Sequence, residues 1–295
     1  MKKLHGTGVA LVTPFDETGA IDFKGLKKLL QHTAKGADYF VVVGTTGEAA
    51  TLTVDETKQI LSFIQQNNPK KLPIVYGIGG NDTQEVIREI WETDFSGIDA
   101  ILSVSPYYNK PSQEGIYQHY MKLAKESPVP IIIYNVPGRT ASNITAETTL
   151  RLAKASPKFI AVKEASGNLE QCMKILKDAP KGFMLISGDD MLTVPLYAMG
   201  SVGVISVLAN AFPAVFQKVK EYATAGKFDK ATKEQFKLLD ISGPMYEEGN
   251  PVGVKYLLSE MGVCKNVLRL PHVAASQTLQ KKIKSLYEKI KTRKG

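Results

Sequence analysis

Eight short apolar runs, separated by stretches of helical periodicity, constrain the fold of this chain more than any other feature. The runs are rich in Val and Ile and bounded by Gly or Pro: GVALVTPF (8–15), DYFVVVGTT (38–46), PIVYGIGG (73–80), AILSVSPYY (100–108), PIIIYNVP (130–137), FIAVKEAS (159–166), FMLISGDD (183–190) and GVISVLAN (203–210). Continuous runs of this kind are typical of strands buried on both faces of a parallel sheet. Eight strand–helix units over about 220 residues favour a (β/α)8 TIM barrel. No G-x-G-x-x-G follows the first run, which disfavours a dinucleotide-binding sheet.

The stretches between the runs carry helix signals. Apolar residues recur at helical spacing over 26–33, and Thr53 and Glu56 have the spacing of a capping box. Three further N-caps are predicted at Ser112, Thr145 and Asp190. After about residue 225 the pattern is helical only. The sequence therefore predicts a catalytic barrel over 1–224 and a C-terminal helical extension over 225–295, with helices at 227–242, 251–261 and 276–292.

Composition excludes several classes of protein. The net charge is +8, but seven of the basic residues, Arg293 and Lys294 among them, lie in the last fifteen positions with only Glu288 opposing them. This predicts a solvated helix face rather than a nucleic-acid or membrane surface. The two cysteines and four scattered histidines suggest neither a disulfide nor a metal centre. No run is long enough for a signal peptide or a membrane span, so a cytoplasmic protein is predicted.

Lys163 is the most informative polar residue because it follows an apolar strand, Phe159–Val162. Burial disfavours the charged ammonium, and a neutral amine can attack a ketone to form a Schiff base. The alternative is a structural lysine paired with a carboxylate such as neighbouring Glu164, and the strand position leaves both interpretations open. Lys255, within the helical run VGVKYLL, is expected instead to extend its ammonium to the surface.

Other polar residues also follow predicted strands, where barrel enzymes place their active sites. Tyr134 could relay a proton or hydrogen-bond within the core, and the Thr45–Gly47 turn could bind a carboxylate or form a plain loop. Arg139 could clamp a carboxylate or remain solvated. The Gly200–Gly203 turn is a weak indication of a phosphate site, because glycine turns are common.

Six segments in order resemble motifs of the dihydrodipicolinate synthase / N-acetylneuraminate lyase superfamily: GTTGEAATLT (44–53), SPYYNKPSQEGIYQHY (105–120), YNVPGRT (134–140), VKEASGNL (162–169), SGDD (187–190) and GVISVLAN (203–210). The resemblance covers nearly the whole chain. It implies a pyruvate-dependent aldolase that needs no cofactor, and Arg139 directly after YNVPG favours condensation with aspartate 4-semialdehyde in lysine and diaminopimelate biosynthesis.

The resemblance also implies a role for each site residue. Lys163 would form the imine, and Tyr134, Thr45 and Tyr108 would relay protons. Substrate contacts would come from Thr46 and nearby backbone amides for the pyruvate carboxylate, from Arg139 for the semialdehyde carboxylate, and from the backbone carbonyls of Gly188 and Ile205. Tyr108 would come from a neighbouring subunit, so a homo-oligomer is expected, most simply a tetramer built as a dimer of dimers.

Relatives that respond to L-lysine bind it at positions that match Ala49, Ala50, Val54, Thr57, Asn81, Glu85 and Tyr107. Strongly inhibited relatives carry imidazoles where this chain has Val54 and Thr57, so weak inhibition or none is expected. Three alternative functions are a sister lyase for sialic or keto-sugar acids, a catalytically silent barrel, and a phosphate-ligand barrel. The intact Lys163, Tyr134, Thr45 and Tyr108 set argues against the silent barrel.

Overall fold

The computed structural model describes residues 2–292, and its eight strands form a closed parallel barrel in chain order. The strands are β1 (Gly6–Ala10), β2 (Tyr39–Val42), β3 (Ile74–Gly77), β4 (Ala100–Val104), β5 (Ile131–Asn135), β6 (Phe159–Glu164), β7 (Met184–Ser187) and β8 (Gly203–Ser206). The predicted (β/α)8 barrel with a C-terminal helical extension is confirmed. Arg293 and Lys294, part of the predicted basic helix face, lie outside the described residues.

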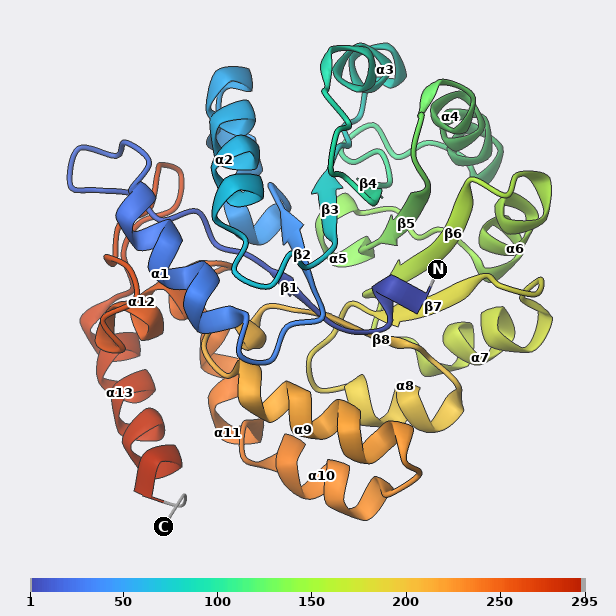
Figure 1. Ribbon diagram of the computed structural model, residues 1–295. Coiled ribbons are helices and arrows are strands. Elements are labelled where there is room, and N and C mark those ends of the chain that lie inside the picture. The colour runs from blue at the N-terminus through green and yellow to red at the C-terminus, as the bar shows by residue number, and fades with distance from the viewer. Residues whose placement is uncertain (1, 293–295) are drawn as a thin grey trace. The chain divides into compact units, whose positions relative to one another are not determined.

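Helices follow the strands along the chain (Figure 1). They are α1 (Phe23–Thr33), α2 (Val54–Asn67), α3 (Thr83–Glu92), α4 (Gln113–Glu126), α5 (Pro137–Thr140), α6 (Ala146–Ala155), α7 (Leu169–Asp178), α8 (Thr193–Met199), α9 (Pro213–Thr224), α10 (Phe228–Phe236), α11 (Leu239–Ser242), α12 (Val252–Glu260) and α13 (Gln277–Thr292). The single helix predicted over 227–242 is wrong, since α10 and α11 are separated by a turn that buries Leu238. Among residues 2–292, none of the helices combines the length and apolarity needed to cross a bilayer.

Most of the apolar runs extend beyond their strands at the carboxyl end. β2 ends at Val42 and β4 at Val104, so the polar residues that follow them lie in loops rather than on the ladder. β6 ends at Glu164, one residue after Lys163, and β8 ends at Ser206. Apolar character marks where a strand begins, but it continues into buried loops after the ladder has stopped. The candidate site residues are therefore divided between strand ends and loops.

Side-chain caps define the starts of several helices. Thr53 and Glu56 form the predicted capping box at α2, and Ser112 and Thr145 cap α4 and α6 by accepting from backbone N–H groups. The prediction for Asp190 is wrong, because α8 begins later in the chain and has no side-chain cap.

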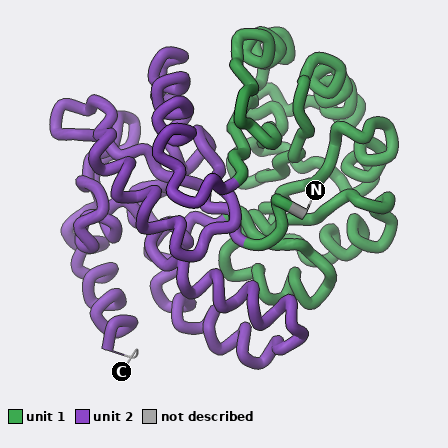
Figure 2. Tube along the Cα trace, in the orientation of Figure 1, with its two compact units in different colours: residues 1–6, 73–205 green, residues 7–72, 206–295 purple. Residues whose placement is uncertain are grey.

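The chain divides into two compact units (Figure 2). Unit 1 comprises residues 1–6 and 73–205, and its helices α3, α4, α6, α7 and α8 lie outside its strands (Figure 1). Unit 2 comprises residues 7–72 and 206–295 and contains the C-terminal helices, with α9 beside α10 and α12 beside α13. Unit 2 is thus assembled from two segments that lie far apart in the sequence.

Candidate active site

Unit 1 brings Tyr134 and Lys163 together on neighbouring strands. The two residues are register partners between β5 and β6, and alternation along the strands places both side chains on the same face of the sheet. The Lys163 Nζ lies 4.0 Å from the centroid of the Tyr134 ring, and each residue is only 7% exposed. A buried amine beside a phenol can attack a carbonyl carbon while the phenol exchanges protons with the reacting oxygen.

The next residue on each strand faces the opposite side. Glu164 is 2% exposed, and its carboxylate accepts from Asn135 Nδ2 at 3.1 and 3.0 Å, from the Ser166 N–H at 2.8 Å and from Gln171 Nε2 at 2.8 Å. All of these groups are neutral donors, and each carboxylate oxygen accepts two of the hydrogen bonds. Lys163 and Glu164 are successive residues of β6, so their side chains face opposite sides of the sheet, and among residues 2–292 they form no ion pair. The interpretation of Lys163 as the partner of Glu164 is therefore wrong.

The Glu164 network also holds the segment that follows β5. Asn135 Oδ1 accepts from the Ile144 N–H at 2.9 Å. Asn143 Oδ1 accepts from Asn135 Nδ2 and Gln171 Nε2, and Asn143 Nδ2 donates to Gln171 Oε1. This fixes the segment on both sides of Arg139, which lies on the short helix α5 with an exposed side chain. Sequence reasoning missed the network; the available signal was a carboxylate and an amide directly following the two candidate catalytic residues.

The other candidate site residues of unit 1 differ in their exposure and backbone conformation. Tyr108 is 88% exposed with a left-handed backbone at φ 71°, whereas Tyr107 is 41% exposed. The Gly188 N–H donates to the Glu164 carbonyl at 2.7 Å, and a Cβ there would lie 2.5 Å from the Ala165 Cβ, so only glycine fits. Ile205 is 1% exposed within β8.

The glycines after β7 have structural explanations. Gly200 ends α8 in a left-handed conformation at φ 108°, and a Cβ on Gly203 would lie 2.0 Å from the Gly6 carbonyl oxygen. These constraints account for both residues without a phosphate ligand.

Unit 2 carries the threonine turn, which we define as Thr45–Glu48. It follows β2 as a single 3₁₀ turn, with Thr45 exposed and Thr46 only 3% exposed. Thr13 donates to the Gly47 carbonyl at 2.6 Å. The turn presents one hydroxyl outwards and buries the other.

Lys255 is fully buried, so the expectation that it extends to the surface is wrong. Its Nζ pairs with the Glu48 carboxylate and donates to the Val267 carbonyl at 2.8 Å. Residues 252–258 of α12 are all buried, which leaves the ammonium no route to solvent. Burial lowers the pKa of Lys255, although the Glu48 charge opposes this change.

The candidate effector residues lie partly in each unit. In unit 2, Val54 is 57% exposed and the Thr57 hydroxyl donates to the Val54 carbonyl at 2.7 Å. In unit 1, Glu85 pairs with Arg88 at 2.8 Å, and the Asn81 carbonyl accepts from Asn109 Nδ2 at 2.9 Å. Ala49 and Ala50 follow the threonine turn in the short 3₁₀ helix Ala49–Thr51.

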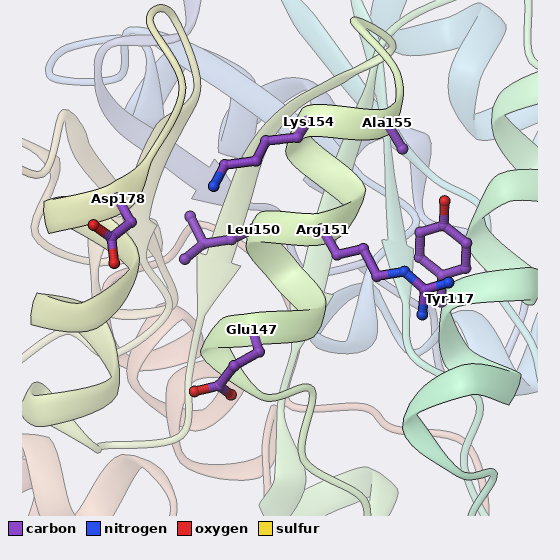
Figure 3. Close-up of a pocket in the computed structure, with 7 residues that line it drawn as sticks. All are labelled: Tyr117, Glu147, Leu150, Arg151, Lys154, Ala155 and Asp178. Atoms are coloured by element: carbon purple, nitrogen blue, oxygen red, sulfur yellow. The ribbon is translucent and has the colours of Figure 1, made fainter.

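An open depression on the outside of unit 1 contains none of these candidates (Figure 3). It is lined by Tyr117, Glu147, Leu150, Arg151, Lys154, Ala155 and Asp178. The Arg151 guanidinium lies 3.6 Å over the Tyr117 ring and pairs with Glu114. The charged residues that line this depression are all exposed on helices. Within residues 2–292 there is also no group of three or more His, Cys, Asp or Glu residues that could hold a metal ion.

A parallel (β/α)8 barrel with a buried lysine and tyrosine paired at neighbouring strand ends defines a class of enzyme suited to carbonyl chemistry through a lysine amine. The sequence profile of the dihydrodipicolinate synthetase family matches residues 3–290, and the chain belongs to that family.

Curated and solved relatives agree with this assignment. A 4-hydroxy-tetrahydrodipicolinate synthase from Cytophaga hutchinsonii is 48% identical over 291 residues, which cover 98% of each chain. Solved dihydrodipicolinate synthases from Acinetobacter baumannii, complexed with pyruvate, and Cyanidioschyzon merolae, with lysine bound, are each 35% identical with a TM-score of 0.94. Each comparison covers 98% of this chain and 99% of the solved chain.

Proposed function

We propose that this chain condenses pyruvate with L-aspartate 4-semialdehyde to give 4-hydroxy-tetrahydrodipicolinate, in lysine and diaminopimelate biosynthesis. The observation that carries the proposal is the buried Lys163–Tyr134 pair on adjacent strands, in a chain 48% identical to a relative named for this reaction. A sister lyase for sialic or keto-sugar acids is disfavoured by that relative's name and by Arg139 after β5.

The proposed chemistry follows from the amine. Neutral Lys163 attacks the ketone carbon of pyruvate, and loss of water gives an imine whose protonated form withdraws electrons from the methyl carbon. Removal of a methyl proton gives an enamine, which forms the new carbon–carbon bond with the aldehyde while the aldehyde oxygen takes up a proton. The amino group of the semialdehyde then replaces Lys163 at the imine carbon, which closes the ring and frees the enzyme. The lysine supplies the electron sink, so no external cofactor is proposed.

Other residues bind the substrates and move protons in this scheme. We assign proton relay to Tyr134, Thr45 and Tyr108, and the pyruvate carboxylate to Thr46. Arg139 binds the semialdehyde carboxylate; its exposed side chain has no hydrogen bond or ion pair to other described residues, which suits a ligand-binding role. The backbone carbonyls of Gly188 and Ile205 are assigned the remaining substrate contacts.

We also propose that the protein is cytoplasmic and forms a homo-oligomer, a dimer of dimers. Its proposed partners are small-molecule substrates, with no nucleic acid and no membrane. The exposed Tyr107 and Tyr108 side chains support an interface, because two adjacent aromatic residues are costly to leave in water. The division into a barrel over 1–224 and an extension over 225–295 also remains a proposal.

L-lysine is proposed to inhibit this enzyme weakly or not at all. Val54 offers no hydrogen bond, the Thr57 proton is already donated within α2, and Glu85 already pairs with Arg88. Each missing polar contact costs about 0.5–1.5 kcal/mol, or a few-fold to about tenfold in affinity.

Borohydride trapping tests the proposed function. Reduction in the presence of pyruvate should leave a stable adduct on Lys163, and Lys163→Ala should abolish both the adduct and product formation. Lys158→Ala is the matched control, because Lys158 lies just before β6, at its other end, and donates to the Ser127 carbonyl. An adduct on another residue, or product formation by Lys163→Ala, would disprove the assignment.

A further inference from the structure

The threonine turn is held by residues from the C-terminal part of unit 2. Side chains contact the turn at three points: Thr46, Glu48 and the Gly47 carbonyl, the last of which accepts from Thr13 near the start of unit 2. Asn250 and Lys255, which make the first two, lie just before and within α12, about 200 positions along the chain from the turn they contact. Helix α12 packs beside α13 (Figure 1). Neither contact is a feature that local sequence reveals.

The first contact orients a hydroxyl group. Asn250 Nδ2 donates to Thr46 Oγ1 at 3.1 Å, and both residues are buried, at 5% and 3% exposure. A hydroxyl has a single proton to donate and oxygen lone pairs that accept. Because the Thr46 oxygen accepts from Asn250, its proton stays available to another acceptor, and none is found for it among residues 2–292.

The second contact fixes the end of the turn. Glu48 adopts a left-handed backbone at φ 57°, and its carboxylate is fully buried. One oxygen pairs with Lys255, and the other accepts from the Arg269 N–H at 3.1 Å. Lys255 Nζ also lies 4.2 Å from the centroid of the Phe15 ring. The buried charges are thus fully satisfied, and loss of one partner would leave the other uncompensated.

We propose that Asn250 and Lys255 are positioning residues for substrate binding by the threonine turn. Asn250 holds the Thr46 hydroxyl so that its proton is directed at the carboxylate of the keto acid, and Lys255 holds the turn through Glu48. The inference rests on the proposed function, since it takes Thr46 as the group that binds this carboxylate. It gives the C-terminal helices a part in substrate affinity.

A double-mutant cycle tests the role of Asn250. Thr46→Val removes the hydroxyl at nearly constant volume, and Asn250→Ala removes the donor. Each should raise the KM for pyruvate about tenfold or more, because a hydrogen bond to a charged group is lost. If Asn250 acts through the hydroxyl, the double variant should match Thr46→Val alone. At saturating pyruvate each variant should still form the borohydride adduct on Lys163. Multiplicative effects, or an unchanged KM in Asn250→Ala, would overturn the inference.

The ion pair needs a variant that still folds. Single changes leave a buried charge, so the test is the neutral double variant Glu48→Gln with Lys255→Met. It should fold, as judged by circular dichroism, yet show a raised KM for pyruvate. The matched control is Glu260→Gln with Lys284→Met, which removes a solvent-accessible ion pair of 3.0 Å that α12 makes with α13. The control should keep the wild-type KM. A wild-type KM in the neutral Glu48 and Lys255 variant would overturn the role of Lys255.

The outcomes separate the two proposals. A wild-type chain that forms no adduct with pyruvate overturns both of them. A wild-type chain that forms the adduct on Lys163, with multiplicative effects in the cycle, overturns only the positioning role.

Discussion

Replacing Glu164 by Gln should damage both stability and turnover, because this residue links β5, β6 and α7 directly behind Tyr134 and Lys163. Each carboxylate oxygen accepts two hydrogen bonds, one of them from Asn135. The new amide keeps one oxygen and puts an NH₂ group where the other was. Gln171 Nε2 has further acceptors at 3.2 and 3.3 Å, so we expect the NH₂ group to face Gln171.

The magnitude follows from the contacts that are lost. Two hydrogen bonds to a charged acceptor disappear, each worth about 1.5–3 kcal/mol, while burying a neutral amide costs less than burying an ion. We expect a net loss of about 2–4 kcal/mol in the free energy of unfolding. Displacement of the β5–β6 pair should also lower kcat about tenfold or more, which corresponds to about 1.4 kcal/mol in activation free energy.

Urea denaturation followed by circular dichroism, together with initial rates of product formation, measures both effects. Glu170→Gln is the matched control, because Glu170 lies on α7 with its side chain 72% exposed and pairs with Lys174 at 2.9 Å. It should change stability by less than about 0.5 kcal/mol. If Glu164→Gln were as stable and as active as this control, the inferred role of the network would be refuted.

Four further predictions can be checked directly. Arg139→Ala should lower kcat/KM for aspartate semialdehyde while pyruvate trapping at Lys163 persists; equal turnover would contradict the assignment. Titrating L-lysine against the initial rate should give weak or no inhibition, and strong inhibition at low micromolar lysine would show that Val54 and Thr57 are misinterpreted. Sedimentation should show a homo-oligomer, so a fully active monomer would disprove a role for Tyr108 across an interface. Burial lowers the pKa of His119 from 6.5 to about 4, so stability present above pH 6.5 should fall by up to about 3 kcal/mol as the pH drops towards 4. His119→Gln should show a shallower pH dependence in denaturant titrations, and an identical slope would count against this.

The barrel could be predicted because each strand can be recognised from its local sequence. Runs such as Ile131–Ile133 and Phe159–Val162 are apolar and largely β-branched, and they need no distant partner to be recognised. The strand ends could not be placed, because Thr45 and Tyr108 follow apolar residues that continue into buried loops.

The candidate site could be predicted in part for the same reason. Lys163 and Tyr134 stand out as polar residues at the ends of apolar strands, and the structure pairs them. The burial of Lys255 could not be predicted, because a lysine in an apolar helix is expected to reach solvent unless its counter-charge is known. That counter-charge, Glu48, lies 207 positions away, and no helical or strand period links the two.

The discontinuity of unit 2 has a consequence for synthesis on the ribosome. Nearly all of unit 1 is one continuous stretch, 73–205, which can begin to fold as soon as it emerges. Residues 7–72 are made first, yet Glu48 acquires its counter-charge only when Lys255 leaves the exit tunnel. Residues 7–72 are therefore expected to gain protection from proteases and hydrogen exchange later than residues 73–205, and the threonine turn is expected to form only after Lys255 has emerged.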